Sequence, residues 1–133
     1  MRDCNGLFWA ASTRWLDSMG SALLAEAEAL REGGRLILEG TRENVILETD
    51  SQELVSLWNN KCKHCSEVMT ILGDIEEMTK TLPSTRVVHT RRTMNYAAHL
   101  CAKHALACTQ SFLWSNPPSF LLQCLQFDCN NSI

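Results

Sequence analysis

Three short segments in a fixed order constrain the fold of this chain most strongly. They are residues 24–30 (LAEAEAL), 45–51 (VILETDS) and 89–100 (HTRRTMNYAAHL). The first predicts a helix that carries a carboxylate, the second a strand that ends on a carboxylate, and the third a basic loop that opens another helix. If the three segments fold together, they predict one acidic, metal-binding site that faces a nucleic-acid backbone.

Length and composition are typical of one globular domain. The chain has 133 residues, of which 45% are hydrophobic, enough to form an apolar core. The formal net charge of −3 argues against nucleic-acid binding through a broad positively charged surface, so any contact with nucleic acid must be local. No apolar run reaches the roughly 20 residues that cross a bilayer.

The 7 cysteines are scattered and do not form a disulfide framework. The first residues contain no apolar signal segment, so we expect reduced, mostly buried thiols in an intracellular protein. Cys62-Lys63-His64-Cys65 has the two-residue gap of a zinc knuckle. Because no second matching pair follows and a structural zinc site needs four ligands, a zinc site is not favoured.

Asn5-Gly6 predicts a hairpin turn close to the start of the chain. A strand is predicted over residues 7–13, with Phe8 and Trp9 at its centre. The few residues before the turn leave almost no strand to pair across it. The sequence therefore predicts a fold that lacks its first strand.

Ser21 is predicted to cap a helix over residues 21–39. At about 100° per residue, one face of this helix gathers its small and apolar side chains. They are Leu23, Ala27, Leu30, Gly34, Ile37 and Leu38. Glu26 borders this face, whereas Glu28 and Glu32 point away from it and are expected to be solvent-exposed.

The rest of the chain alternates strands with amphipathic helices. We expect strands at 45–49 and 86–89, helices through Trp58, at 66–80 and at 94–109, and a short C-terminal helix in the tail from Trp114. The predicted packed face of the 94–109 helix consists of Ala97, Cys101, His104 and Cys108, a set suited to close packing. Because His104 lies on this face, it is expected to be a core histidine.

Asp50 follows an apolar strand, at the place where open α/β sheets bind ligands, although Asp50-Ser51 is equally expected to cap the next helix. Glu26 alone is more easily explained as a boundary residue. A functional role is better supported for Glu26 and Asp50 as a pair than for either residue alone, because two-metal phosphodiester hydrolysis needs clustered carboxylates, usually three or four. Arg91 and Arg92, between a strand and a helix start, suit phosphate contact, with a solvated basic turn as an equal alternative.

These segments resemble the plant ribonuclease H-like domain of reverse-transcriptase-derived proteins with non-LTR retrotransposon ancestry. The residues that carry the resemblance are Arg2-Asp3 with Asn5-Gly6, residues 25–30 (AEAEAL), 48–51 (ETDS), Arg92, Asn95, Ala98-His99-Leu100, 102–106 (AKHAL), and Trp114 with 117–122 (PPSFLL). The match covers nearly the whole chain, and the ordered set is specific.

The resemblance implies a ribonuclease H-like α/β fold, a mixed sheet with helices on both faces, here lacking the first strand. It divides the chain into an N-terminally truncated domain at residues 1–112 and a C-terminal tail at 113–133 with a short docking helix. The sheet edge left by the missing strand would favour a partner strand.

The implied chemistry is Mg²⁺- or Mn²⁺-dependent hydrolysis of the RNA strand in an RNA–DNA hybrid, with four acidic residues holding two metal ions. Glu26 and Asp50 match two of these four, and Arg92 and Asn95 match the nucleic-acid contacts. The first aspartate belongs to the absent strand. The fourth position is His99, whose neutral imidazole is a poor substitute for a hard anionic ligand.

Two interpretations follow. The chain is either a hybrid ribonuclease whose missing aspartate comes from a longer product, or a degenerate, non-catalytic module that binds nucleic acid or protein. His99 and the absent strand favour the second for this chain. We therefore expect an inactive chain without a bound metal. We also expect Glu26 and Asp50 on one face, within metal-bridging reach of each other.

Overall fold

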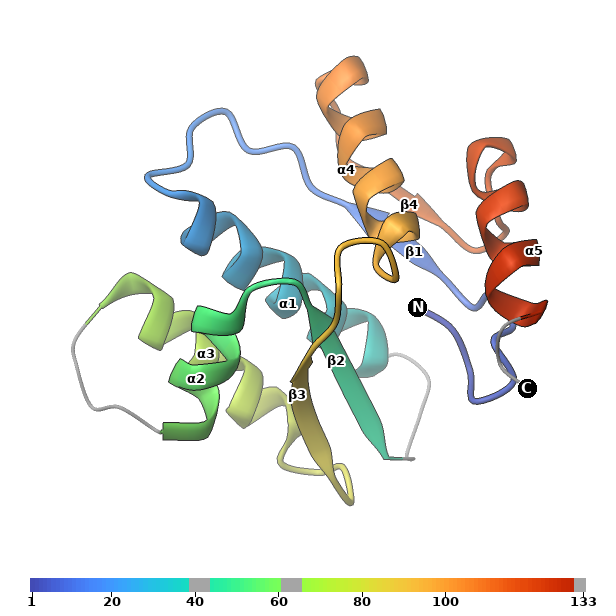
Figure 1. Ribbon diagram of the computed structural model, residues 1–133. Helices are drawn as coiled ribbons and strands as arrows, with labels where there is room; N and C mark the ends of the chain where they lie inside the picture. Colours follow the sequence, from blue (N-terminus) through green and yellow to red (C-terminus); the bar gives the residue numbers. More distant parts are fainter. Residues whose placement is uncertain (39–43, 61–65, 131–133) are drawn as a thin grey trace. The chain divides into compact units, whose positions relative to one another are not determined.

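The computed structural model describes residues 1–38, 44–60 and 66–130, and the chain forms two compact units. We call Met1–Trp15 with Arg92–Ile133 the terminal unit, and Leu16–Arg91 the central unit. The central unit contains α1 (Ala22–Leu38), β2 (Val45–Thr49), α2 (Gln52–Asn60), α3 (Glu67–Thr79) and β3 (Thr85–His89) (Figure 1). The terminal unit contains β1 (Ala11–Thr13), α4 (Tyr96–Cys108), β4 (Phe112–Trp114), the 3-10 turn η1 (Ser119–Leu121) and α5 (Leu122–Asn130).

The sheet of the central unit is the parallel pair of β2 and β3, which run side by side in Figure 1. Thr49 lies opposite His89 in the register, so both strands end at the same edge. Burial alternates along β2, as expected for a strand with one packed face. α1 packs on that face, where Leu47 lies beside Gly33.

α1 begins after Ser21, whose hydroxyl accepts a hydrogen bond from the backbone N–H of Leu24 at 3.1 Å. The predicted cap and helix are therefore confirmed. The buried face consists of Leu24, Ala27, Leu30, Gly34 and Ile37. Leu38, expected on this face, is 48% exposed because it is the last residue of the helix and follows Ile37 directly.

α3 follows its N-cap Ser66, whose side chain accepts a hydrogen bond from the Met69 backbone N–H at 3.3 Å. The predicted helix is confirmed, and its buried residues are Val68, Ile71, Leu72, Ile75 and Thr79. α1 and α3 pack on each other. A Cβ at Gly34 would stand 3.4 Å from the Met78 side chain, so a glycine there permits close approach of the two helices.

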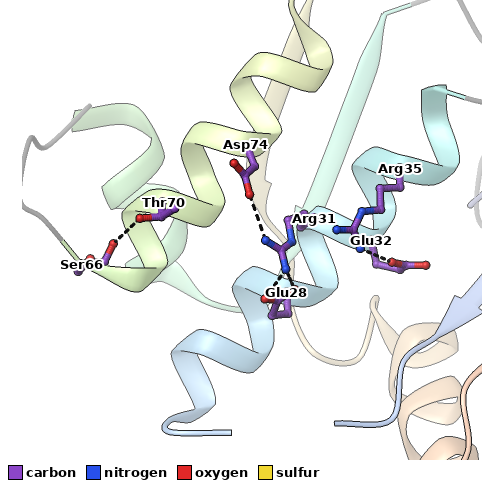
Figure 2. Close-up of polar contacts among 7 residues, drawn as sticks. All are labelled: Glu28, Arg31, Glu32, Arg35, Ser66, Thr70 and Asp74. Carbon is purple, nitrogen blue, oxygen red and sulfur yellow. Dashed lines mark hydrogen bonds and ion pairs between the residues drawn. The ribbon is translucent and has the colours of Figure 1, made fainter.

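Ion pairs add to the contact between α1 and α3 (Figure 2). Arg31 donates to both carboxylate oxygens of Glu28, at 2.6 and 2.7 Å, and to Asp74 of α3 at 3.0 Å. Arg35 pairs with Glu32 at 3.3 Å. The expectation that Glu28 and Glu32 are solvent-exposed is therefore wrong. Arginines three residues further along the helix lie beside them and leave both half-buried.

The sheet of the terminal unit joins the two ends of the sequence. β1 pairs with β4 in antiparallel orientation, with Ala11 opposite Trp114 and Thr13 opposite Phe112. The predicted strand over residues 7–13 is therefore too long, because only its last three residues form β1. β4 was not predicted, since a three-residue strand is too short to show an alternating apolar pattern.

The turn at Asn5-Gly6 is confirmed, and Gly6 has a φ of 78°, a region that glycine adopts without a steric penalty. The Asp3 carboxylate accepts hydrogen bonds from the backbone N–H groups of Asn5 and Leu7, at 2.8 and 2.9 Å. Across this turn, Arg2 and Phe8 form an isolated antiparallel bridge, and the Trp9 backbone N–H donates to the Met1 carbonyl oxygen at 3.0 Å. The start of the predicted strand therefore pairs with the residues before the turn, and pairing with β4 begins at Ala11.

α4 is shorter than predicted, and Thr109, with a φ of 51°, follows its last residue in the left-handed conformation. The core of the terminal unit consists of Ala11, Cys101 and Leu121, with Phe8, Ala97, Leu100, Trp114, Phe120 and Leu125 partly buried against it. Cys108 is exposed although it was expected on the packed stripe, because it lies in the last turn of α4. The predicted C-terminal helix is confirmed as α5, with Cys124 buried.

The fold class is α/β with small sheets, consistent with a ribonuclease H-like fold. In the described part of the chain, the expected mixed sheet takes the form of one parallel and one antiparallel two-stranded sheet. The boundary between a domain at 1–112 and a tail at 113–133 stays a prediction. No helix within the described ranges is long and apolar enough to span a membrane.

The cysteines with described side chains divide evenly between surface and interior. Cys101 and Cys124 are buried, whereas Cys4 and Cys108 are exposed, and all four are free thiols. Two of these four thiols are buried, so the expectation that most thiols are buried holds for only half of them. The candidate zinc knuckle at residues 62–65 lies outside the described residues.

Candidate functional site

Thr49 organises the carboxyl end of β2. Its side chain is 2% exposed, and its hydroxyl donates a hydrogen bond to the Glu26 carboxylate at 3.4 Å. The same hydroxyl accepts a hydrogen bond from the Ser51 backbone N–H at 3.1 Å. The first bond draws the half-buried Glu26 of α1 to the end of the strand that Asp50 follows. Glu26 and Asp50 therefore lie at the same end of β2, and metal-bridging reach between their carboxylates stays a prediction.

The capping role expected of Asp50-Ser51 is filled by Ser51. Its hydroxyl accepts a hydrogen bond from the Leu54 backbone N–H at 3.2 Å, which satisfies one of the N–H groups left over at the start of α2. Leu54 is fully buried and anchors the first turn of this helix in the core. The strand, the cap and the helix thus fix the backbone around Asp50.

The end of β3 brings a basic residue to the same edge. The Thr90 backbone N–H donates to the Thr49 carbonyl oxygen at 2.8 Å and continues the parallel pairing by one step. Arg91 follows and is exposed. Because parallel strands end side by side, Asp50 and Arg91 follow neighbouring strand ends, which is where open α/β sheets place ligands.

The donor set at this edge does not fit a site for two metal ions. Two Mg²⁺ ions that clamp a phosphodiester need a cluster of hard oxygen ligands, usually from three or four carboxylates. Glu26 and Asp50 supply two carboxylates, and Thr49 supplies a hydroxyl. Nowhere in the described ranges do three or more His, Cys, Asp or Glu side chains gather to hold a metal ion.

The start of α4 presents the other residues that the sequence singled out. Arg92 is exposed, and Asn95 is the N-cap, although its side chain makes no capping hydrogen bond. His99 is exposed one turn further on. These three residues belong to the terminal unit, whereas Glu26 and Asp50 belong to the central unit. A single site that joins both groups stays a prediction.

His104 lies among the aromatic rings of the terminal unit. Its ring stacks on Phe120, with centroids 4.5 Å apart and an interplanar angle of 19°. The Phe112 and Trp114 rings lie 5.1 and 5.7 Å away. The Cys108 Sγ is 3.8 Å from its Nε2. His104 therefore packs as expected, half-buried rather than fully enclosed.

Charged residues are distributed unevenly along the sequence, and none of the motifs described above depends on this feature. Residues 78–127 contain no Asp or Glu, and their basic residues are Lys80, Arg86, Arg91, Arg92 and Lys103. The terminal unit has four Lys and Arg against two Asp and Glu, whereas the central unit has eight against thirteen. The net charge of −3 thus combines a basic unit with an acidic one, and a count along the sequence would have found the acid-free stretch.

The comparisons with known proteins give one match. A family described as reverse transcriptase-like matches residues 1–105, which include the segments around Glu26, Asp50, Arg92 and His99. No curated protein and no solved structure matches the chain.

Proposed function

The chain belongs to the reverse transcriptase-like family of ribonuclease H-like domains, and from this premise we propose that it binds nucleic acid without cleaving it. The ligand that we propose is an RNA–DNA hybrid or a related nucleic acid. Plant retrotransposon ancestry is part of the same proposal. A partner strand at a sheet edge remains a separate prediction.

One observation carries the binding proposal, the acid-free stretch of residues 78–127. A nucleic-acid backbone carries one negative charge per phosphate, and its contact surfaces therefore need local positive charge without carboxylates nearby. The overall charge of −3 does not oppose such contact, because the acidic residues are concentrated in the central unit. The binding surface that we propose is accordingly local.

Arg92 and Asn95 are the proposed phosphate contacts. Arg92 is exposed three residues before the N-cap of α4, and a guanidinium can bind a phosphate through two parallel hydrogen bonds. Backbone N–H groups of the first helical turn and the helix dipole favour an anion at the same place. The Asn95 side chain, which makes no capping bond, adds a polar group there.

The proposed lack of cleavage rests on the donor set. Hydrolysis by two metal ions requires more carboxylates than Glu26 and Asp50 provide, and His99, at the fourth position, is not a hard anionic ligand. If the chain were active, its cofactor would be Mg²⁺ or Mn²⁺. The Thr49 hydroxyl supports a structural role for Glu26, since it already bonds to that carboxylate.

Binding is tested by fluorescence anisotropy with a labelled RNA–DNA hybrid at several salt concentrations. We expect binding that weakens steeply with salt, and a several-fold weaker affinity for Arg92→Ala. Arg35→Ala is the matched control, because Arg35 is an exposed arginine of the acidic unit paired with Glu32. An equal loss in both variants, or no binding at all, would contradict the proposal.

Cleavage is tested on the same hybrid with Mg²⁺ or Mn²⁺. We expect no more product from the chain than from its Asp50→Asn variant. Metal-dependent cleavage that Asp50→Asn abolishes would show that the chain is an active hybrid ribonuclease and would overturn the proposal of inactivity.

A protein-interaction module is the second candidate. It is favoured by large apolar side chains on the surface of the terminal unit, chiefly Leu106 and Leu113, which are 65% and 67% exposed. Absence of hybrid binding at every salt concentration would favour this alternative.

A further inference from the structure

The outward face of α4 carries three polar or aromatic side chains in one row. Tyr96, His99 and Lys103 are spaced by three and four residues, so at about 100° per residue they fall within about 60° of one another. Tyr96 is 50% exposed, and His99 and Lys103 are both exposed. We call these three residues the α4 stripe.

The α4 stripe is not needed to pack the helix. Ala97, Leu100 and Cys101 of α4 take part in the core of the terminal unit, whereas none of the three stripe residues belongs to that core. Leu106, which follows the stripe further along α4, is also exposed. The stripe therefore lacks the packing role that most aromatic residues have.

The two rings of the stripe form a small aromatic surface. The Tyr96 and His99 ring centroids are 6.2 Å apart, with an interplanar angle of 31°. Flat rings at the surface are platforms on which nucleobases stack, and such stacking is tolerant of sequence. Lys103 lies one turn beyond His99, where its ammonium group suits the phosphate of a strand that runs along the helix.

Charge complementarity favours nucleic acid over a protein as the occupant. α4 contains no Asp or Glu, and it lies within the acid-free residues 78–127. From Tyr96 to Lys103 the helix rises about 10 Å, which is enough for a short stretch of strand.

We propose that the α4 stripe binds single-stranded nucleic acid, with a base stacked on Tyr96 beside His99 and a phosphate held by Lys103. This inference rests on the proposed nucleic-acid-binding function and adds a single strand as a ligand of this surface, beside the hybrid proposed for Arg92 and Asn95. A single strand is required because the bases of a duplex or hybrid are stacked on each other and present no free face to Tyr96.

The chain contains a single tyrosine, which makes the test direct. A chain labelled with ¹³C in its tyrosine ring gives ring signals from Tyr96 alone. Addition of a single-stranded pyrimidine oligonucleotide is expected to shift these signals, whereas a blunt duplex of the same sequence leaves them in place. Unshifted signals in the presence of a bound single strand would overturn the proposal.

Affinities measured by anisotropy complete the test. Tyr96→Ala is expected to weaken single-strand binding about tenfold, whereas Tyr96→Phe, which keeps the ring, stays within about twofold of the parent chain. Lys103→Ala is expected to lower the slope of affinity against salt by about one, as for one lost phosphate contact. Arg35→Ala is again the control, because Arg35 is an exposed basic residue outside the acid-free stretch and is paired with Glu32.

The outcomes separate this inference from the proposed function. Binding of a single strand that Arg92→Ala weakens, but that neither moves the Tyr96 signals nor responds to Tyr96→Ala, would overturn the α4 stripe alone. Failure to bind any of these nucleic acids would overturn both. Equal effects of Tyr96→Ala and Tyr96→Phe would show that the hydroxyl, not the ring, makes the contact, and would also overturn the stacking proposal.

Discussion

The central and terminal units stabilise their helices in different ways. In the central unit, α1 and α3 meet through an apolar core to which Arg31 adds ion pairs with Glu28 and Asp74 (Figure 2). In the terminal unit, α4 packs with His104 among three aromatic rings. Thirteen of the 15 carboxylates belong to the central unit, where Arg31 and Arg35 pair with carboxylates at short range.

This difference bears on function. Where basic side chains have carboxylates as neighbours, they serve the fold and are poor phosphate ligands. The acid-free part of the terminal unit leaves Lys103 on the surface without a carboxylate on its own helix. The central unit, which contains Glu26 and Asp50, is therefore less suited to attract a polyanion than the basic terminal unit.

The largest expected effect tests the apolar core of the central unit. Leu54→Ala should lower the free energy of unfolding by about 2–5 kcal/mol, because Leu54 is fully buried and its removal leaves a cavity. Urea denaturation followed by circular dichroism measures this loss. Leu57→Ala, at a half-buried position on the same helix, is the control with a smaller loss. Equal losses would contradict the burial that separates the two leucines.

A second prediction concerns the aromatic packing of the terminal unit. His104→Ala should cost about 1–3 kcal/mol, because it removes a ring stacked on Phe120 and close to the Phe112 and Trp114 rings. The loss should be nearly independent of salt concentration. His99→Ala, at an exposed position on the same helix, should leave stability almost unchanged. Urea denaturation at low and high salt distinguishes these results.

The ion pairs of the central unit should contribute less. Arg31→Met keeps the apolar stem but removes the bonds to Glu28 and Asp74, and we expect a loss of about 0.5–1 kcal/mol that diminishes with salt. Arg35→Met should cost less, since Arg35 pairs only within α1 in this network. A loss that persists in high salt would show that packing, not charge, explains the contribution of Arg31.

The smallest effect is a pH dependence in the terminal unit. Burial raises the pKa of the Cys101 thiol above its ordinary value of 9.0. The folded chain therefore keeps this proton to higher pH than the unfolded chain, so the contribution of this thiol to stability is constant well below pH 9.0 and falls as the pH rises through and beyond that value. Urea denaturation across this range should show the fall. Cys101→Ala should remove this part of it, whereas Cys108→Ala, at an exposed thiol, should not.

The amino-acid sequence predicted the elements that have a strong local signal. The cap residues Ser21 and Ser66 are followed by long apolar stripes, and both helices begin where these residues place them. The parallel strands were found from their runs of apolar residues. β4 was missed because three residues do not define a pattern, and its pairing with β1 depends on a segment about 100 residues away in the sequence.

The candidate site likewise divides into features that the sequence predicts and features that depend on contacts between distant segments. The sequence singled out Glu26, Asp50, Arg92, Asn95 and His99 as candidates for metal and phosphate binding, because the chemical type of each side chain is read directly from it. Only the tertiary structure decided that the Thr49 hydroxyl draws Glu26 to the end of β2, that Glu28 and Glu32 pair with arginines, and that Tyr96 faces outward. The physical reason is that side-chain identity fixes what chemistry is possible, whereas hydrogen bonds and burial depend on contacts between distant segments, which form only when the chain folds.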